Sequence, residues 1–180
     1  FTTSAANADI NLDQTTVTGS TQLNTNGATG NASFTTTGPV VLNGTTTGGN
    51  LTVNTTGNIT QSANLTVGGT TSLTGNNITL ANAANSFGGD VGFTGANVSL
   101  QDNGALGLDT STATGTLLIQ AAGAVTQSGA ITTGSDATVT ATGFDITLNN
   151  ASNSFAGTVG FSGANVNLRD TTALAVAAST

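Results

Sequence analysis

An internal duplication is the feature that most constrains the fold of this chain. Residues 77–102 read NITLANAANSFGGDVGFTGANVSLQD, residues 145–170 read DITLNNASNSFAGTVGFSGANVNLRD, and 18 of the 26 aligned positions are identical. The offset between the copies is 145 − 77 = 68. Upstream, GNITQSANLTVGGTTSLT from Gly57 aligns with GAVTQSGAITTGSDATVT from Gly123, where the offset is 123 − 57 = 66. Self-similarity at such a fixed, long period is typical of a repeat architecture.

The duplication divides the chain into repeats of one solenoid segment, residues 1–180. We place the repeats at about 57–122 and 123–180, with a degenerate copy before residue 57, and expect the segment to be part of a longer array. The two extra residues of the second copy fall between Thr140 and Asp145, where we predict a turn.

Within each repeat, apolar residues lie two apart around a small or polar residue, which is the period of a β-strand with one buried face. Such segments are Leu51–Val53, Leu65–Val67, Ile78–Leu80, Val91–Phe93, Val98–Leu100, Leu106–Leu108 and Leu117–Ile119. Gly-Asn pairs between them, such as Gly57-Asn58 and Gly75-Asn76, are predicted to form tight corners with left-handed backbone.

Short strands and corners inside a long repeat predict an all-β fold, a right-handed parallel β-helix with three short strands per coil. We expect about eight coils of roughly 22 residues, with about three coils to each large repeat. At about 4.8 Å per stacked strand, the rod would be roughly 35 to 40 Å long. A β-sandwich needs longer strands and would not repeat its sequence in this way.

The charge balance excludes two classes of partner. Arg169 is the one basic residue, and the net charge is −7. Nucleic acids and anionic membrane surfaces are bound through Lys and Arg. The sequence contains no run of about 18 apolar residues, which a helix would need to span a bilayer. With no cysteine, the fold uses neither disulfides nor thiolate metal sites.

Catalytic chemistry has few residues to draw on, because the sequence contains no His, Cys, Lys, Glu or Tyr. The carboxylates are Asp9, Asp13, Asp90, Asp102, Asp109, Asp136, Asp145 and Asp170. Repeat phase predicts Asp102 and Asp170 at equivalent, solvated corners about three coils apart, roughly 14 Å. That is too far for a catalytic pair, so we expect no enzyme, no catalytic or metal-binding residue and no cofactor.

Two sequence patterns invite a ligand, calcium in one case and ice in the other, but both also fit ordinary structural roles. Gly88-Gly89-Asp90 is similar to a calcium-binding β-roll turn, but its second copy, Ala156-Gly157-Thr158, lacks the carboxylate. Thr-x-Thr steps such as Thr138–Thr140 and Thr112–Thr114 are compatible with an ice-binding face only if they recur once per coil on one face, which the sequence does not indicate.

Asparagine and phenylalanine are also open to two interpretations. Asn58, Asn77, Asn97 and Asn165 stand beside predicted strands, and we expect their side chains to bridge corners of successive coils rather than to carry glycans. The phenylalanines that match between copies are expected to fill the core rather than to stack on sugars. They are Phe87, Phe93, Phe155 and Phe161.

Three segments and their second copies resemble the shaft repeats of filamentous-haemagglutinin-like large exoproteins, the adhesins of two-partner secretion in Gram-negative bacteria. They are GNITQSANLTVGG from Gly57, NITLANAANSF from Asn77 and GANVSLQDNGALGL from Gly95. The resemblance covers the chain from Ala8, without the secretion domain or a toxin tip. It implies a structural or adhesive shaft on a secreted or cell-surface protein, which spaces a binding or effector region from the cell.

Three alternatives remain beside the shaft. The main one is an extracellular filament subunit whose uncapped solenoid ends stack. A carbohydrate-active enzyme and an ice-binding protein are further alternatives. The expected partners are neighbouring coils or copies of the chain end to end, and cell-surface receptors or glycans, with no nucleic acid and no membrane insertion.

Overall fold

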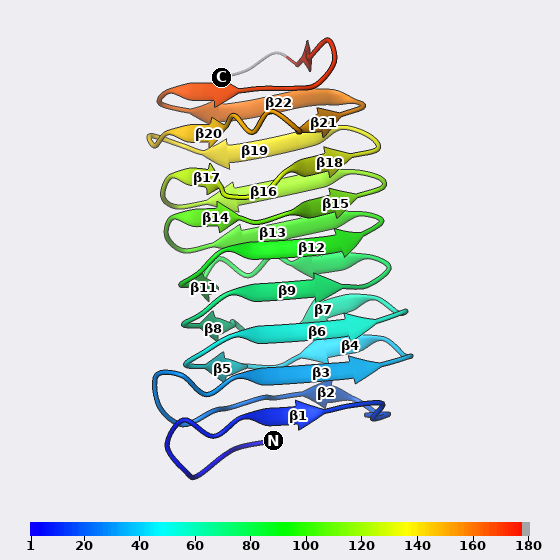
Figure 1. Cartoon of the computed structure of the whole chain (residues 1–180), viewed down its shortest axis with the longest axis vertical. Coiled ribbons are helices and arrows are strands. Elements are labelled where there is room, and N and C mark those ends of the chain that lie inside the picture. The colour runs from blue at the N-terminus through cyan, green and yellow to red at the C-terminus, as the bar shows by residue number, and fades with distance from the viewer. Residues whose placement is uncertain (178–180) are drawn as a thin grey trace.

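The chain is a stack of short coils that rises from the N-terminus at one end to the C-terminal strands at the other (Figure 1). The computed structural model describes residues 1–177, which form 24 β-strands and no helix, with every strand pair parallel. The predicted parallel β-solenoid of about eight coils is confirmed. Residues 178–180 of the predicted second repeat lie outside the described residues. Within 1–177, the chain has no helix that could cross a membrane.

Each complete coil contributes three strands in turn, one to each of three faces. Face 1 consists of β1 (Ile10–Leu12), β3 (Ala32–Thr36), β6 (Leu51–Thr55), β9 (Thr71–Thr74), β12 (Val91–Gly95), β15 (Ser111–Ala113), β18 (Ile131–Thr133) and β21 (Ser154–Phe155). Face 2 consists of β2 (Ser20–Thr21), β4 (Val40–Leu42), β7 (Ile59–Gln61), β10 (Ile78–Leu80), β13 (Val98–Asp102), β16 (Leu117–Ala121), β19 (Ala137–Ala141) and β22 (Thr158–Gly163). Face 3 begins as a separate three-stranded sheet of β5 (Thr46–Thr47), β8 (Thr66–Val67) and β11 (Ser86–Phe87). Above β11 the third place in the coil is taken by β14 (Leu106–Leu108), β17 (Val125–Gln127), β20 (Ile146–Leu148) and β23 (Val166–Leu168), which pair into the sheet of face 1 through β12. The last strand, β24 (Ala175–Val176), pairs with β22.

The step from one coil to the next is close to the predicted length but varies along the chain: Ile10 pairs with Ala32, so that the step there is 32 − 10 = 22. Leu51 pairs with Thr71, which pairs with Val91, so that the step along the chain is 71 − 51 = 20. The sequence did not reveal this variation, because strands with polar or small inward residues carry no apolar alternation. Thr47, Ser111 and Ala113 point inward in β5 and β15 but do not mark a strand in the sequence.

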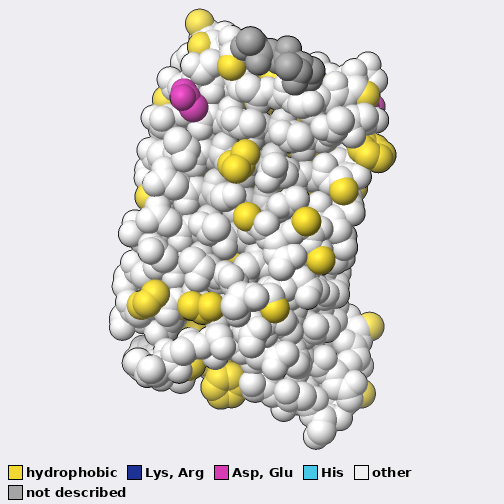
Figure 2. Space-filling model, turned by 180° about the vertical axis from the view of Figure 1, so that it is seen from behind, with side chains coloured by type: hydrophobic (Ala, Val, Ile, Leu, Met, Phe, Trp, Pro, Cys, Tyr) yellow, Lys and Arg dark blue, Asp and Glu magenta, His cyan; other side chains and the backbone are white. Residues whose placement is uncertain are grey.

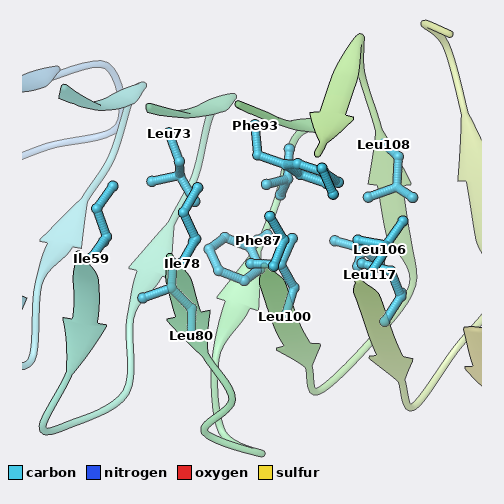
Figure 3. Packing of buried hydrophobic residues seen from close by; sticks show 14 of the residues in the cluster. Ile59, Leu73, Ile78, Leu80, Phe87, Phe93, Leu100, Leu106, Leu108 and Leu117 are labelled. Carbon is cyan, nitrogen blue, oxygen red and sulfur yellow. The ribbon is translucent and has the colours of Figure 1, made fainter. Parts of the chain in front are cut away.

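The core is a column of aliphatic and phenylalanine side chains along the axis of the rod. On face 2, Ile59, Ile78 and Val98 stack in register and are almost completely buried. In Figure 3, Ile78, Phe87 and Leu100 meet in the interior. Each fully buried side chain of this size contributes about 1.5–3 kcal/mol. The same column continues through neighbouring coils, so the core grows with length.

Glycine at the corners has a different role from the one predicted. Gly57 and Gly75 do not have positive φ, and neither does Asn58. A Cβ atom on Gly57 would lie 2.6 Å from the backbone nitrogen of Pro39, one coil below. Glycine is therefore needed there because stacked corners approach closely. The predicted turn after Thr140 does contain a left-handed glycine, Gly143, with φ of 83°.

The sequence repeat corresponds to ten strands rather than to a whole number of coils. Ile59 in β7 aligns with Val125 in β17, and Ile78 in β10 aligns with Ile146 in β20. Since three strands make a coil, ten strands make three and one-third coils. Equivalent segments therefore take successive places in the coil: β10 is a second strand, in the nine-stranded sheet, and β20 is a third strand, in the twelve-stranded sheet. The trace at Ile10–Leu12, which is β1, lies on face 1.

The longest strands of the coil also change face from one repeat to the next. The strands of four to six residues lie on face 1 up to β12 and on face 2 from β13 onward. We call β3, β6, β9 and β12 long sheet 1, and β13, β16, β19 and β22 long sheet 2.

The coil step shortens where the long strands change face. From Val91 to Leu108 the step is 108 − 91 = 17, and β12 pairs there with both β14 and β15. The same short step recurs one repeat later, from Val159 of β22 to Val176 of β24. The short step is therefore a property of the repeat itself.

The inward and outward assignment of β13 can be tested by a pair of aspartates. Leu100 is fully buried, whereas Ser99 lies on the outer surface and is partly exposed. Leu100→Asp should cost several kcal/mol, because a carboxylate would be buried without a partner. Ser99→Asp should change the stability by roughly 0.5 kcal/mol or less. Thermal unfolding measures both, and a harmless Leu100→Asp would contradict the assignment.

Candidate functional site

Asparagine side chains connect successive coils at the corner before face 2, as the sequence predicted. The backbone N–H of Asn77 donates to Oδ1 of Asn58 (3.1 Å), and that of Asn97 donates to Oδ1 of Asn77 (3.2 Å). The Nδ2 groups of Asn77 and Asn97 reach the same oxygens, at 3.2 and 3.0 Å. Each amide therefore holds the next coil in register.

The same bridge occurs at the other two corners. Before face 1, the backbone N–H of Asn31 donates to Oδ1 of Asp9 (2.7 Å), and that of Asn50 donates to Oδ1 of Asn31 (2.8 Å). Before face 3, Nδ2 of Asn165 donates to Oδ1 of Asp145 (2.8 Å). Asp9 and Asp145 occupy equivalent positions of the repeat and serve different corners, as the ten-strand unit requires.

A buried polar cluster lies under the protruding loop between β10 and β11. Asn85 is fully buried, and its Oδ1 accepts hydrogen bonds from the backbone N–H of Leu65 (2.9 Å) and from Nε2 of Gln61 (2.8 Å). Its Nδ2 donates to Oε1 of Gln61 (3.0 Å) and to the backbone oxygens of Leu80 and Gln101 (both 3.1 Å). One amide thus ties three consecutive coils together. We call this arrangement the corner cluster.

The second copy rebuilds the corner cluster on another corner. Asn153 is fully buried, and its Oδ1 accepts from Nε2 of Gln127 (2.8 Å) and from the backbone N–H of Ile131 (2.9 Å). Its Nδ2 donates to Oε1 of Gln127 (2.8 Å). Sequence reasoning missed this cluster. The available signal was the identity of polar residues in both copies, TQS at 60–62 and 126–128, and NSF at 85–87 and 153–155.

Asp102 is not the solvated corner residue that was predicted. It is 3% exposed, and its carboxylate accepts the backbone N–H groups of Phe87 (3.0 Å) and Gly104 (3.2 Å). Burial raises the pKa of Asp102, although hydrogen bonds from the backbone N–H groups of Phe87 and Gly104 oppose the shift. The carboxylate replaces backbone acceptors at the point where the step between coils changes, which is why it lies inside.

Asp102 and Asp170 also do not lie one above the other. Asp102 ends β13 on face 2, whereas Asp170 follows β23 on face 3. Asp170 accepts the backbone N–H of Phe155 (3.1 Å), just as Asp102 accepts that of Phe87. The two residues keep their local role and change face, because the repeat is three and one-third coils long.

The glycines of the calcium-like turn, Gly88 and Gly89, do not have positive φ. A Cβ on either would lie 2.7 Å from a backbone oxygen of the coil below, so close stacking explains them. Asp90 accepts a hydrogen bond from the hydroxyl of Ser128. Among residues 1–177, no three His, Cys, Asp or Glu residues form a group that could hold a metal ion.

The phenylalanines chosen as core residues are buried. Phe87, Phe93 and Phe155 are 2–4% exposed, and Phe161 packs on the core while partly buried. Their core role is therefore confirmed.

Hydrophobic and charged side chains cover only a small part of the surface seen in Figure 2. One outward column of face 1 has a hydroxyl or amide residue in each coil, which the sequence had not indicated because the step between coils varies, from 112 − 94 = 18 to 154 − 132 = 22 residues. The column is Thr35, Asn54, Thr74, Thr94, Thr112, Thr132 and Ser154. The Thr pairs considered for ice binding do lie on different faces, 138–140 in β19 and 112–114 at β15.

A shallow hollow interrupts long sheet 1 where Gly92 has no side chain. It has a volume of about 150 Å³, and the hydroxyl residues around it include Ser72, Thr74 and Thr94. Asp90 and Asp109 stand at its edge. The hollow offers hydrogen-bond donors and acceptors to a ligand, but no cationic side chain.

Removal of the buried amide in the corner cluster should be costly. Asn85→Ala would leave buried groups of Gln61, Leu65 and Leu80 without their partner, so we expect a loss of about 3 kcal/mol or more in the free energy of unfolding. Asn54→Ala is the matched control, because Asn54 is exposed in the middle of β6, and it should cost roughly 0.5 kcal/mol or less. Denaturant unfolding compares them, and similar losses would contradict the role of the cluster.

The buried carboxyl predicts a specific pH dependence of stability. Because the pKa of Asp102 is raised above 3.8 in the folded chain, its protonated form is favoured by folding. Its contribution is fully present below pH 3.8 and is lost as the pH rises through the raised pKa. We expect Asp102→Asn to remove this fall from a series of melting temperatures between pH ~3 and ~7. Asp109→Asn, at an exposed position, should keep it; the same pH profile for both variants would exclude Asp102 as the cause.

Comparison with known proteins places the duplication in a family. A family model described as "Repeats of unknown function (DUF5649)" matches residues 29–94 and 95–162. The matches begin just before β3 and β13, so each corresponds to one ten-strand unit, and we call them unit 1 and unit 2. No curated protein and no solved structure matches the chain. Because the two units cover well over half of its length, the chain belongs to the DUF5649 repeat family.

Proposed function

We propose that this chain is a shaft segment of a secreted or cell-surface bacterial exoprotein of the filamentous-haemagglutinin-like kind, and that it spaces a binding or effector region from the cell. The observation that carries the proposal is the continuity of the hydrogen-bonded stack. One sheet alone runs through nine strands, from β2 to β24, and crosses the border between the two units without a break.

The side chains add stiffness to this stack. The asparagine bridges connect corners coil by coil, and each corner cluster ties neighbouring coils from inside. A domain hinge needs a place where few contacts cross, whereas the coils here are bonded through backbone and side chains along the rod. A rod of this type transmits position over distance, which is what a spacer does.

The surface fits the same role. The chain has one basic and eight acidic residues and its outer positions are otherwise mostly neutral and polar, so it favours solubility over adhesion to anionic surfaces. The proposal assigns the chain no reaction, because its carboxylates have no histidine, lysine or cysteine to work with. Stacking of whole chains end to end into filaments is the alternative, and the scattering experiment below separates it from the spacer.

The spacer function predicts that length is added unit by unit. A chain in which residues 29–94 are duplicated in tandem should be longer by about 16 Å, which is three and one-third coils at about 4.8 Å each. Small-angle X-ray scattering should show this increase in maximum dimension with an unchanged cross-sectional radius. The two chains should remain discrete particles.

A larger cross-section would contradict a continuous rod. Particles that grow in length with protein concentration would contradict the spacer function and support the filament subunit.

A further inference from the structure

We propose that the two long sheets are equivalent binding surfaces for a neutral, hydroxyl-rich polymer, and that they face in different directions, so that one chain connects two separate polymer strands. This inference rests on the rod proposed above and gives its surface a partner.

The long sheets contain the longest strands of the rod. Each has four strands of four to six residues with at least two outward positions per strand, and Gly92 and Gly160 are the outward positions without a side chain. Long sheet 1 presents two columns that include Thr52 and Ser72 in one and Asn54 and Thr74 in the other. Long sheet 2 presents two columns that include Ser99 and Thr138 in one and Gln101 and Gln120 in the other. The shorter strands of the other faces give mostly one outward residue each.

Charge selects the partner. No outward position of either long sheet carries a charge, and the carboxylates lie at the strand ends and corners. The acidic corners repel anionic polymers, and the net charge of −7 opposes close packing against a second copy of the chain. Hydroxyl and amide groups both donate and accept hydrogen bonds, which matches the hydroxyl groups of a neutral polysaccharide.

Two local features strengthen the match. The hollow at Gly92 in long sheet 1 combines hydroxyls with the carboxylates of Asp90 and Asp109, which accept hydrogen bonds from hydroxyl groups. On long sheet 2, Leu118 is 37% exposed beside a second shallow hollow, where Ser99 supplies a hydroxyl. An apolar side chain among polar ones can contact the C–H face of a sugar ring.

The ten-strand unit determines how these surfaces are displayed. Long sheet 1 lies on face 1 and long sheet 2 on face 2, about 16 Å further along the rod. A straight polymer strand that lies on one long sheet cannot continue onto the other. Each unit therefore holds its own strand, weakly, and an array of units gains strength by binding several strands.

The experiment is native gel electrophoresis through gels that contain dextran, amylose or galactomannan, with alginate as the anionic comparison. The acidic chain should be retarded by at least one of the three neutral polymers and not by alginate. Added sodium chloride should leave the retardation unchanged. Each variant is compared with its own mobility in a polymer-free gel.

Two double variants separate the surfaces. Thr52→Asp with Thr74→Asp alters long sheet 1, and Gln120→Asp with Thr138→Asp alters long sheet 2. Each should reduce the retardation by roughly half, and their combination should abolish it. Thr46→Asp with Thr66→Asp is the control, because these residues are exposed on the short strands β5 and β8 and should have no effect. Melting temperatures verify that all variants are folded.

Light scattering of mixtures with the retarding polymer tests whether the two long sheets bind separate polymer strands. The unaltered chain should cross-link polymer strands and raise the scattering, whereas either double variant should still be retarded but should no longer cross-link. The proposal is overturned if no neutral polymer retards the chain, if the control pair acts like a long-sheet pair, or if a double variant still cross-links. If the rod lengthens by one unit as described above but binds no neutral polymer, the spacer function stands and the proposed polymer-binding surface is wrong.

Discussion

The structure depends on the stacking of each residue on its counterpart one coil below. Parallel backbone hydrogen bonds make this stacking, which is stable because most inward side chains are apolar and because the corners approach closely. Ile59, Ile78 and Val98 meet the first requirement, and glycine at position 57 meets the second. The asparagine bridges add a side-chain bond at the corners, where strands end and backbone groups would otherwise lack partners.

The mismatch between the sequence repeat and the coil is the second constraint. A unit of ten strands cannot fit a whole number of three-strand coils, so equivalent segments occupy successive faces. This explains why Asp102 and Asp170 share their local bonds but lie on different faces, and why the corner cluster occurs at two different corners. A repeated surface feature is thereby distributed around the rod.

Sequence reasoning predicted the solenoid, the inward residues of the apolar strands and the asparagine bridges, because these follow from alternation and from residues beside strands. It could not give the step of each individual coil, since inward Thr47 and Ser111 do not look like core residues. Without these steps, the sequence could not reveal that equivalent strands change face between units, nor which outward residues stack in columns. The burial of Asp102 was missed because a carboxylate held by backbone N–H groups has no signal in a single sequence.

The change of face between unit 1 and unit 2 is tested most directly at the border between them. There, Thr94 of β12 pairs with Thr112 of β15, whereas the longer coil expected from the sequence would place Thr116 beside Thr94. Because the chain has no cysteine, two variants can be oxidised without interference: Thr94→Cys with Thr112→Cys, and Thr94→Cys with Thr116→Cys. The account predicts that the first pair closes a disulfide quickly and the second does not, as measured by the loss of free thiols. Rapid closure of the second pair alone would contradict the ten-strand unit.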